Sequence, residues 1–138
     1  MSHQNSIKLS ELFFEECARE ITEIEKIEKL LTTGADINFQ SSADGYTALM
    51  LAVDKDDELV VAFLLDNGAN PYTKNYYGEI ASDLALRYSP IYRLIKNYEL
   101  LFASFLNDID AVKLAIACGA NIQFKGIHGY TALMIAKK

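Results

Sequence analysis

The sequence has few residues of the kinds that bind metals or perform catalysis. Its 138 residues include two cysteines and two histidines, without a Cys-x-x-Cys pair or a His/Cys cluster, so a zinc site has no support. The glycines are isolated, which excludes a glycine-rich phosphate loop, and neither Gly-x-Ser-x-Gly nor His-Glu-x-x-His occurs. We therefore predict that the chain is not an enzyme and takes no metal, cofactor or small-molecule substrate.

Long apolar runs and clustered basic residues are also absent. No run approaches the roughly 20 apolar residues that a membrane helix needs, and the polar N-terminus lacks the apolar core of a signal peptide. The net charge is −6 and the basic residues are scattered, which argues against nucleic acid as a partner. These features predict a cytoplasmic protein without a membrane or nucleic-acid partner. Secretion by a route that needs no signal peptide is left open.

The two cysteines lie about a hundred residues apart. Cys17 and Cys118 both fall in apolar helical contexts, one near each end of the chain. In an elongated molecule this separation is too large for a disulfide, so we expect two buried free thiols.

Short segments recur along the chain at nearly fixed spacing. Gly45–Met50 returns as Gly129–Met134, and Gly34–Asn38 returns in part as Gly68–Asn70 and Gly119–Ile122. Where the spacing is regular, corresponding glycines are 33 or 34 residues apart. Self-similarity at this period predicts stacked units that share one continuous core, a form that presents a long surface and rarely a catalytic pocket.

Each unit carries two predicted helices, except the last, which stops after one. In the first unit, apolar spacing predicts helices over about 9–17 and 24–31. Thr22 is the expected N-cap of the second helix, with Glu25 completing a capping box, and Gly34 is the expected left-handed C-cap.

The second unit has the clearest signals. Thr47 begins a helix that runs to about Asp54, and Asp56 or Asp57 caps another that ends near Asp66. The acidic residues between these helices thus have a structural role, and an EF-hand calcium loop is excluded because its ligand positions and central glycine are absent. The buried stripe of the second helix is expected to be Val60, Val61, Leu64 and Leu65.

The third unit is irregular. Ile80, Leu84 and Ala85 are the expected inner face of its first helix, and Ser89-Pro90 begins its second. The fourth unit then begins about 15 residues too early. We attribute this to a deleted connection, so that the third unit's second helix turns near Asn97 straight into the fourth unit's first helix as an antiparallel pair.

These motifs resemble the ankyrin repeat, whose units open with Gly-x-Thr-Pro-Leu-His-x-Ala and close with Gly-Ala-Asp-x-Asn. Gly45–Ala52 and Gly129–Ala136 are similar to the opening, and Leu64-Leu65 with Gly68–Asn70 is similar to the close. The family's proline and histidine are replaced by Ala48 and Met50, which predicts looser turns because methionine does not form the histidine's hydrogen bonds.

The resemblance implies an all-α fold, an ankyrin-repeat α-solenoid of about four and a half helix pairs with short β-hairpin fingers, one finger deleted. A finger is expected at 70–78, where Pro71, Asn75 and Gly78 surround tyrosines. The expected divisions are a polar tail at 1–8, then units at 9–43, 44–76, 77–97, 98–127 and 128–138.

In this family, partners are held by the finger tips and the exposed side of the first helices. The resemblance carries that role onto these positions: Tyr46, Asp54, Lys55, Tyr76, Tyr77, Glu79, Arg87, Tyr88, His128 and Tyr130. Tyrosine is common in binding hot spots, which favours a binding role for the group. The alternative is that the tyrosines pack against neighbouring fingers and stiffen the row. Phe105 and Leu106 either form a docking notch or bury against neighbouring helices.

We therefore expect a protein–protein interaction module whose partner is another protein. The rival hypothesis is a regulatory or substrate-recruiting domain of a larger enzyme, truncated at residue 138. We expect the natural protein to continue past Lys138, the alternative being that the last helix acts as a cap. The abundance of Ile, Asn, Lys and Tyr is similar to ankyrin proteins of intracellular bacteria, many of which act as effectors on host proteins, and this implies a host cytosol as the alternative location.

Overall fold

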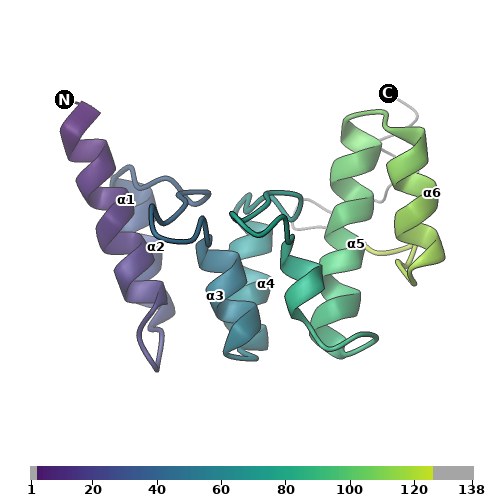
Figure 1. Cartoon of the computed structure of the whole chain (residues 1–138), viewed down its shortest axis with the longest axis horizontal. Helices are drawn as coiled ribbons and strands as arrows, with labels where there is room; N and C mark the ends of the chain where they lie inside the picture. Colours follow the sequence, from purple (N-terminus) through teal and green to yellow (C-terminus); the bar gives the residue numbers. More distant parts are fainter. Residues whose placement is uncertain (1–2, 126–138) are drawn as a thin grey trace.

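The chain folds as a row of helices (Figure 1). The computed structural model describes residues 3–125, with side chains from Ser6 onward, and no strand occurs in that range. In Figure 1, α1 and α3 lie in the nearer layer and α2 and α4 lie behind them. The all-α prediction is confirmed. The helices are α1 (His3–Cys17), α2 (Ile24–Thr33), α3 (Ala48–Asp54), α4 (Glu58–Asp66), the 3₁₀ helix η1 (Ala81–Leu84), α5 (Pro90–Phe105) and α6 (Ile109–Ala117).

Side-chain caps set the starts of most helices. Thr47 accepts a hydrogen bond from the Met50 N–H at 3.3 Å, and Asp57 accepts one from the Val60 N–H at 3.3 Å. Ser89 caps α5 in the same way, with Pro90 in the first helical turn. These starts agree with the sequence prediction, and each cap stabilises its helix by about 1 kcal/mol.

The start of the first two helices differs from the prediction. α1 begins at His3, inside the stretch that we expected to be a polar tail. Thr22 does not cap α2, whose N-cap position is Glu23 without a side-chain cap bond. The Thr22 hydroxyl instead donates to the Cys17 carbonyl at 3.4 Å and accepts from the Lys55 ammonium at 2.6 Å. Thr22 therefore ties two units together rather than beginning a helix.

The ends of α2 and α4 depend on glycine. Gly34 and Gly68 have φ of +124° and +99°, which places both in the region that residues with a Cβ avoid. The N–H groups that follow, of Ala35 and Ala69, return to carbonyls of the preceding helix at 3.0 and 2.9 Å. The predicted C-cap glycines are thus confirmed, and their recurrence follows from this backbone requirement.

One continuous core runs through the row from α1 to α5. The predicted stripe of α4 is confirmed, since Val60, Val61, Leu64 and Leu65 are all buried. Met50 is fully buried at the place where the family carries histidine, so it contributes packing instead of polar contacts. The largest fully buried side chains come from five helices and include Phe13, Ile27, Leu49, Leu64 and Ile95. A second, smaller cluster joins Leu100 to Ala115 and Ala120.

The first helix of the third unit is reduced to one 3₁₀ turn. η1 spans four residues, and Asp83 accepts a hydrogen bond from the Ile80 N–H at 2.9 Å, which closes the turn on itself. Ala81 and Ser82 are its buried residues, whereas Ile80, Leu84 and Ala85 are only partly buried. The prediction of a full helix is therefore wrong, although Leu84 and Ala85 pack against the core as the predicted inner face requires.

The third unit's second helix does not turn near Asn97. α5 continues without a break for 16 residues, from Pro90 to Phe105. Ile91, Ile95 and Tyr98 keep helical spacing through the expected junction, and no Gly or Pro interrupts it. The predicted antiparallel turn is wrong because the two helices are fused into one. In Figure 1 the α5–α6 connection consequently lies on the same side as the loops before α3 and η1, opposite the α3–α4 connection.

A buried ion pair lies in the middle of the fused helix. The Lys96 ammonium and the Glu99 carboxylate are 3.1 Å apart, with both side chains nearly excluded from solvent. Lys96 also lies 5.3 Å from the centre of the Tyr92 ring, and the Glu99 carbonyl accepts the Tyr72 hydroxyl at 3.0 Å. Burial and the neighbouring Glu99 and Asp108 charges raise the pKa of Tyr72 to about 12.

Lys55 fastens the second unit to the first. Its ammonium donates to the Cys17 carbonyl, the Arg19 carbonyl and the Thr22 hydroxyl, each at 2.6 Å. All three donors of a lysine are therefore used inside the chain. Cys17 is buried and unpaired, as expected, and burial raises its pKa to about 12. Cys118 is also unpaired but only partly buried, contrary to the prediction.

Substitution of the buried ion pair gives a first prediction. We expect Lys96→Met to destabilise the fold by about 3–5 kcal/mol, because it leaves the Glu99 carboxylate buried without a counter-ion. The double variant Lys96→Met/Glu99→Leu removes both charges and regains most of the loss. Urea unfolding followed by circular dichroism measures both. Equal losses in the single and double variants would show that packing, not charge, accounts for the effect.

A second prediction concerns Lys55. We expect Lys55→Met to lower the free energy of unfolding by about 2 kcal/mol, because it removes hydrogen bonds from a charged donor to two carbonyls and a hydroxyl. The matched control is Lys26→Met, since Lys26 makes only an exposed ion pair with Glu23 at 3.5 Å. The control loses less than about 0.5 kcal/mol. A Lys55 variant as stable as the control contradicts the fastening role.

Candidate partner-binding surface

Two loops at one edge of the row build the main candidate surface. The first precedes α3, and the second precedes η1. Gln40 donates to the Lys74 carbonyl at 2.8 Å, and the Tyr76 N–H donates to the Asp44 carbonyl at 2.9 Å, so the loops are bonded to each other. The segment 70–78 consists of turns, and the β-hairpin expected there is not formed by strands.

Gly45 allows the loops to approach closely. Its φ is +75°, and a Cβ placed on it would come within 2.5 Å of the Tyr76 ring. The Tyr76 side chain therefore lies over the Gly45 backbone, where no other residue leaves room. This is one physical reason for glycine in the Gly-Tyr-Thr motif.

Side-chain hydrogen bonds order both loops, with Asn75 acting in the second loop and Asp44 in the first. Asn75 is buried, and its Oδ1 accepts the N–H groups of Tyr77 and Glu79 at 2.9 and 3.0 Å. Its Nδ2 donates to the Glu79 carboxylate at 3.0 Å, which fixes that side chain. In the first loop, Asp44 accepts the Tyr46 N–H at 2.9 Å. The side chains that these loops present are thus held by an ordered backbone.

Tyr46 lies where negative charges from three segments meet. Burial raises its pKa first, and the charges of Asp54, Glu79 and Asp44 raise it further. The pKa of Asp54 is likewise raised, first by burial and then by the charge of Glu79. Asp54 is the last residue of α3, and Glu79 lies in the second loop.

The exposed tyrosines extend this cluster outward. Tyr46 is partly buried against the core, whereas Tyr76 and Tyr77 are 64% and 73% exposed. We call the five residues Tyr46, Asp54, Tyr76, Tyr77 and Glu79 the tyrosine–carboxylate surface. All five were among the positions predicted from the sequence. The alternative that the tyrosines only stiffen the row accounts for the Tyr76 contact with Gly45, but not for the exposure of Tyr77.

The remaining predicted positions lie elsewhere. Arg87 and Tyr88 are in the loop between η1 and α5, on the opposite side of the row in Figure 1. There the Arg87 guanidinium lies 5.3 Å from the centre of the Tyr88 ring, and that ring packs edge-on against Tyr92 at 5.8 Å. The Lys55 ammonium is engaged within the chain. His128 and Tyr130 lie outside the described residues.

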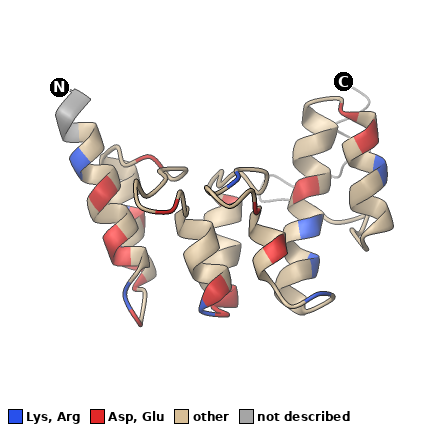
Figure 2. Ribbon diagram, viewed as in Figure 1, with Lys and Arg blue, Asp and Glu red and all other residues tan. Residues whose placement is uncertain are grey.

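The carboxylates of the surface have no partner cation within the described chain. Residues 3–125 contain three ion pairs, Arg19–Glu16, Lys26–Glu23 and Lys96–Glu99. None of these includes Asp44, Asp54 or Glu79. Figure 2 shows that acidic positions predominate over basic ones from α1 to α4.

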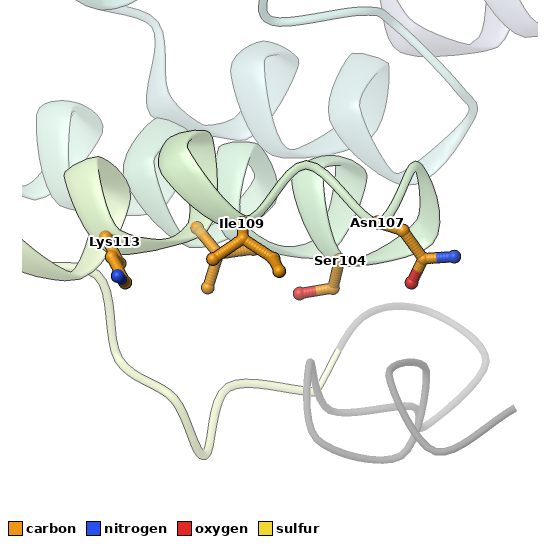
Figure 3. Close-up of a pocket in the computed structure, with 5 residues that line it drawn as sticks. Ser104, Asn107, Ile109 and Lys113 are labelled. Atoms are coloured by element: carbon orange, nitrogen blue, oxygen red, sulfur yellow. The ribbon is translucent and has the colours of Figure 1, made fainter.

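A second region lies at the α5–α6 connection, where a docking notch was one of the two hypotheses from the sequence. Phe105 and Leu106 are 76% and 66% exposed, so the hypothesis that they bury against neighbouring helices is wrong. Beside them lies an open pocket of about 260 Å³ (Figure 3). The apolar residues of α6 were the available signal, but their exposure depends on how α6 packs on the fused helix. The pocket is lined by Ser104, Asn107, Ile109, Val112 and Lys113.

Other kinds of site find no support in the described part of the chain. Residues 3–125 bring together no group of three or more His, Cys, Asp or Glu side chains able to hold a metal ion. Within the same range, no helix has the length and apolarity needed to cross a membrane.

Known proteins share the repeated sequence pattern of this chain. Residues 14–101 match the ankyrin repeat family, described as ankyrin repeats in three copies. The chain is 45% identical over 56 residues to an ankyrin repeat-containing protein of Treponema pallidum (strain Nichols), covering 41% of the chain and 18% of the relative. It is 31% identical over 70 residues to ankyrin repeat domain-containing protein 40 of Mus musculus, covering 51% of the chain and 19% of the relative. The chain thus spans less than a fifth of either relative. Because the family match covers most of its length and agrees with the helix pairs, C-cap glycines and Gly-Tyr-Thr motif described above, the chain belongs to the ankyrin repeat family.

Proposed function

We propose that this chain is a protein–protein interaction module that binds its partner through the tyrosine–carboxylate surface. Ankyrin repeats are a general protein-binding module, which supports the class of function. The observation that carries the proposal is the exposure of Tyr76 and Tyr77 on loops whose backbone is fixed by hydrogen bonds. Tyrosine contributes a large contact area with few rotatable bonds, and ordered loops lose little entropy on binding.

The charge of Asp54 supports a role in binding rather than in folding. It is the last residue of α3, where the negative end of the helix dipole disfavours a carboxylate. Partial burial, and after it the charge of Glu79, disfavours the ionised form further and raises the pKa of Asp54. Residues that reduce stability are expected mainly at functional sites. Asp54 is therefore better explained by a partner than by the fold.

The finer features of the proposal extend beyond the described residues. We propose that His128 and Tyr130 continue the binding face and that the repeat domain has about four and a half units. A cytoplasmic location, or the cytosol of a host cell if the protein is a bacterial effector, belongs to the same proposal.

A second candidate function is a regulatory or substrate-recruiting domain of a larger enzyme. It is favoured by the length of the relatives, of which this chain spans less than a fifth. In that case the tyrosine–carboxylate surface recruits the substrate or the regulator, and catalysis lies in another domain.

Alteration of the exposed tyrosines tests the proposed surface. We expect Tyr76→Ala/Tyr77→Ala to weaken binding of the partner captured by the wild-type chain by tenfold or more, as loss of aromatic hot spots does. Affinity capture followed by titration of the recovered partner measures this. The matched control is Tyr88→Ala, an exposed tyrosine on the opposite side of the row. Circular dichroism should show unchanged helix content, and undiminished capture by the double variant would refute the surface.

The pH dependence of stability tests the role of Asp54. Because folding raises its pKa above the usual 3.8, the neutral form is favoured in the folded state, and this stabilisation is lost as pH rises through the folded pKa. We expect Asp54→Asn to be as stable as wild type or more stable at pH 7, by ~0.5 kcal/mol or less after solvent screening. Below the unfolded pKa the difference disappears.

The control for this experiment is Asp110→Asn. Asp110 lies in the first turn of α6, where the helix dipole favours a negative charge. This variant should lose a few tenths of a kcal/mol at pH 7, the opposite sign to Asp54→Asn. An Asp54→Asn variant less stable than wild type at pH 7 contradicts the assignment of its charge to binding. Thermal unfolding at a series of pH values supplies both comparisons.

A further inference from the structure

The turns between paired helices carry exposed apolar side chains. The three most exposed large aliphatic side chains of the described residues are Leu86, Ile21 and Leu59, at 82%, 79% and 75%. Each lies close to the N-cap of the second helix of its unit, so one falls in each of the first three units. A single exposed leucine is ordinary in a soluble protein, but recurrence at the same turn of successive units points to a shared role. We call these three residues together with Tyr88 the turn-edge surface.

The turns lie along one edge of the row. In Figure 1 the α1–α2, α3–α4 and η1–α5 connections are on the same side, opposite the loops that carry Tyr76 and Tyr77. Lys55 bonds the first two connections to each other, since its ammonium donates to the Arg19 carbonyl and the Thr22 hydroxyl. The second and third are brought together by the packing of η1 on α3 and of α5 on α4. The turn-edge surface is therefore separate from the finger loops.

Tyr88 has a backbone conformation that its residue type disfavours. In three successive turns the residue before the N-cap has a positive φ, at Asp56 (55°), Tyr88 (66°) and Asn107 (57°). Aspartate and asparagine tolerate this left-handed region, whereas a bulky aromatic residue is strained there. Tyr88 is also 56% exposed, so burial in the core does not account for a tyrosine at this position. Backbone strain of this kind persists mainly at functional sites, which favours a binding role for the turn.

The charges at this edge change sign between neighbouring turns. Residues 56–58, directly before Leu59, are all acidic, whereas Arg87 directly follows Leu86. None of these charges takes part in the ion pairs found in residues 3–125. Figure 2 shows the acidic positions at the α3–α4 turn and a basic position at the η1–α5 turn. A bound segment with the opposite charges is therefore attracted at both turns.

The spacing along the edge fits a helix better than an extended segment. Helices that pack on each other lie about 8–10 Å apart, so the turns of neighbouring units recur at about that distance. An α-helix presents the same face again after seven residues, over about 10.5 Å. An extended segment presents the same face at every second residue, over about 6.8 Å, and does not match this interval.

We propose that the turn-edge surface binds an amphipathic helix of a protein partner, independently of the tyrosine–carboxylate surface. Apolar residues seven positions apart on that helix cover the three turns in succession. A basic residue beside the central apolar position faces residues 56–58, and an acidic residue beside the apolar position at Leu86 faces Arg87. These opposite charges fix the direction in which the helix lies along the edge.

A labelled helical peptide provides the probe. It consists of alanine and glutamine with leucine at every seventh position, lysine beside the central leucine and glutamate beside one terminal leucine. The comparison peptide has the same composition with leucines five residues apart, which spreads them around the helix. Fluorescence anisotropy, with the intact chain as titrant, measures the dissociation constants. We expect the designed peptide to bind about tenfold more tightly than the comparison peptide, which cannot cover successive turns with one face.

Protein variants assign the binding to the turns. Leu59→Gln and Leu86→Gln should each raise the dissociation constant of the designed peptide about fivefold, as loss of an apolar anchor does. The matched control is Leu114→Gln, which alters a leucine of α6 that is 64% exposed and should leave binding unchanged. Tyr88→Asn introduces the residue type found at Asn107 in the next turn. It should weaken binding about fivefold without lowering the midpoint of thermal unfolding, because it relieves the strain.

Several results overturn the inference. Equal binding of the two peptides does so, as does failure of both to bind, or binding that persists in the double variant Leu59→Gln/Leu86→Gln. Self-association of the intact chain that this double variant abolishes, measured by sedimentation, assigns the edge to a second copy instead. Binding to phosphatidylcholine vesicles that the double variant abolishes assigns it to a membrane. The proposed function is tested separately, because Tyr76→Ala/Tyr77→Ala alters the finger loops and should leave binding of the designed peptide unchanged.

Discussion

Packing between successive helix pairs is the interaction on which the rest of this molecule depends. A helix such as α3, with seven residues, is too short to be stable alone, and its five buried residues find their partners on α1, α4 and η1. Each large apolar side chain buried in this way contributes about 1.5–3 kcal/mol. Because every pair covers the apolar side of its neighbours, the position of each loop is determined by the stack below it. The loops before α3 and η1 can therefore hold Tyr46, Tyr76 and Glu79 in place without strands of their own.

The same packing explains which features the sequence predicts well. Caps and C-terminal glycines act within one turn of a helix, so Thr47, Asp57, Ser89 and Gly68 are recognisable from local patterns alone. The stripe of α4 follows from helical periodicity and needs no knowledge of its neighbours. The positions assigned to the candidate surface came from the family motif. Tyr46 and Glu79 lie on two loops that hydrogen bonds join, because units two and three stack regularly.

Some of the failures have the opposite character, since they depend on contacts between units. From the sequence alone, Lys55 is expected to be an exposed loop residue. Only the position of the α1–α2 connection shows that Cys17 and Thr22 accept hydrogen bonds from its ammonium. The turn near Asn97 was predicted by counting repeat lengths, although no helix-breaking residue lies between Pro90 and Phe105. The local sequence favoured a continuous helix, and the structure follows it. For Phe105 the sequence left burial and exposure open, and the direction in which α5 leaves the stack keeps it exposed.

The fused helix also limits the extent of the candidate surface. Two helices joined end to end remove one reversal of the chain, so α6 begins on the side of the finger loops rather than opposite them (Figure 1). Asn97, within α5, bonds the Asn121 N–H at 2.7 Å, just as Asn38 bonds the Asn70 N–H at 2.8 Å between regular units. The contact between neighbouring units is thus retained although the loop that normally carries it is missing. Within the described residues, the row of loops ends at Glu79, and beyond it lies the apolar α5–α6 connection. A partner that binds at this edge contacts two loops, two carboxylates and three tyrosines. This small set of groups suits a short segment of the partner better than a broad surface.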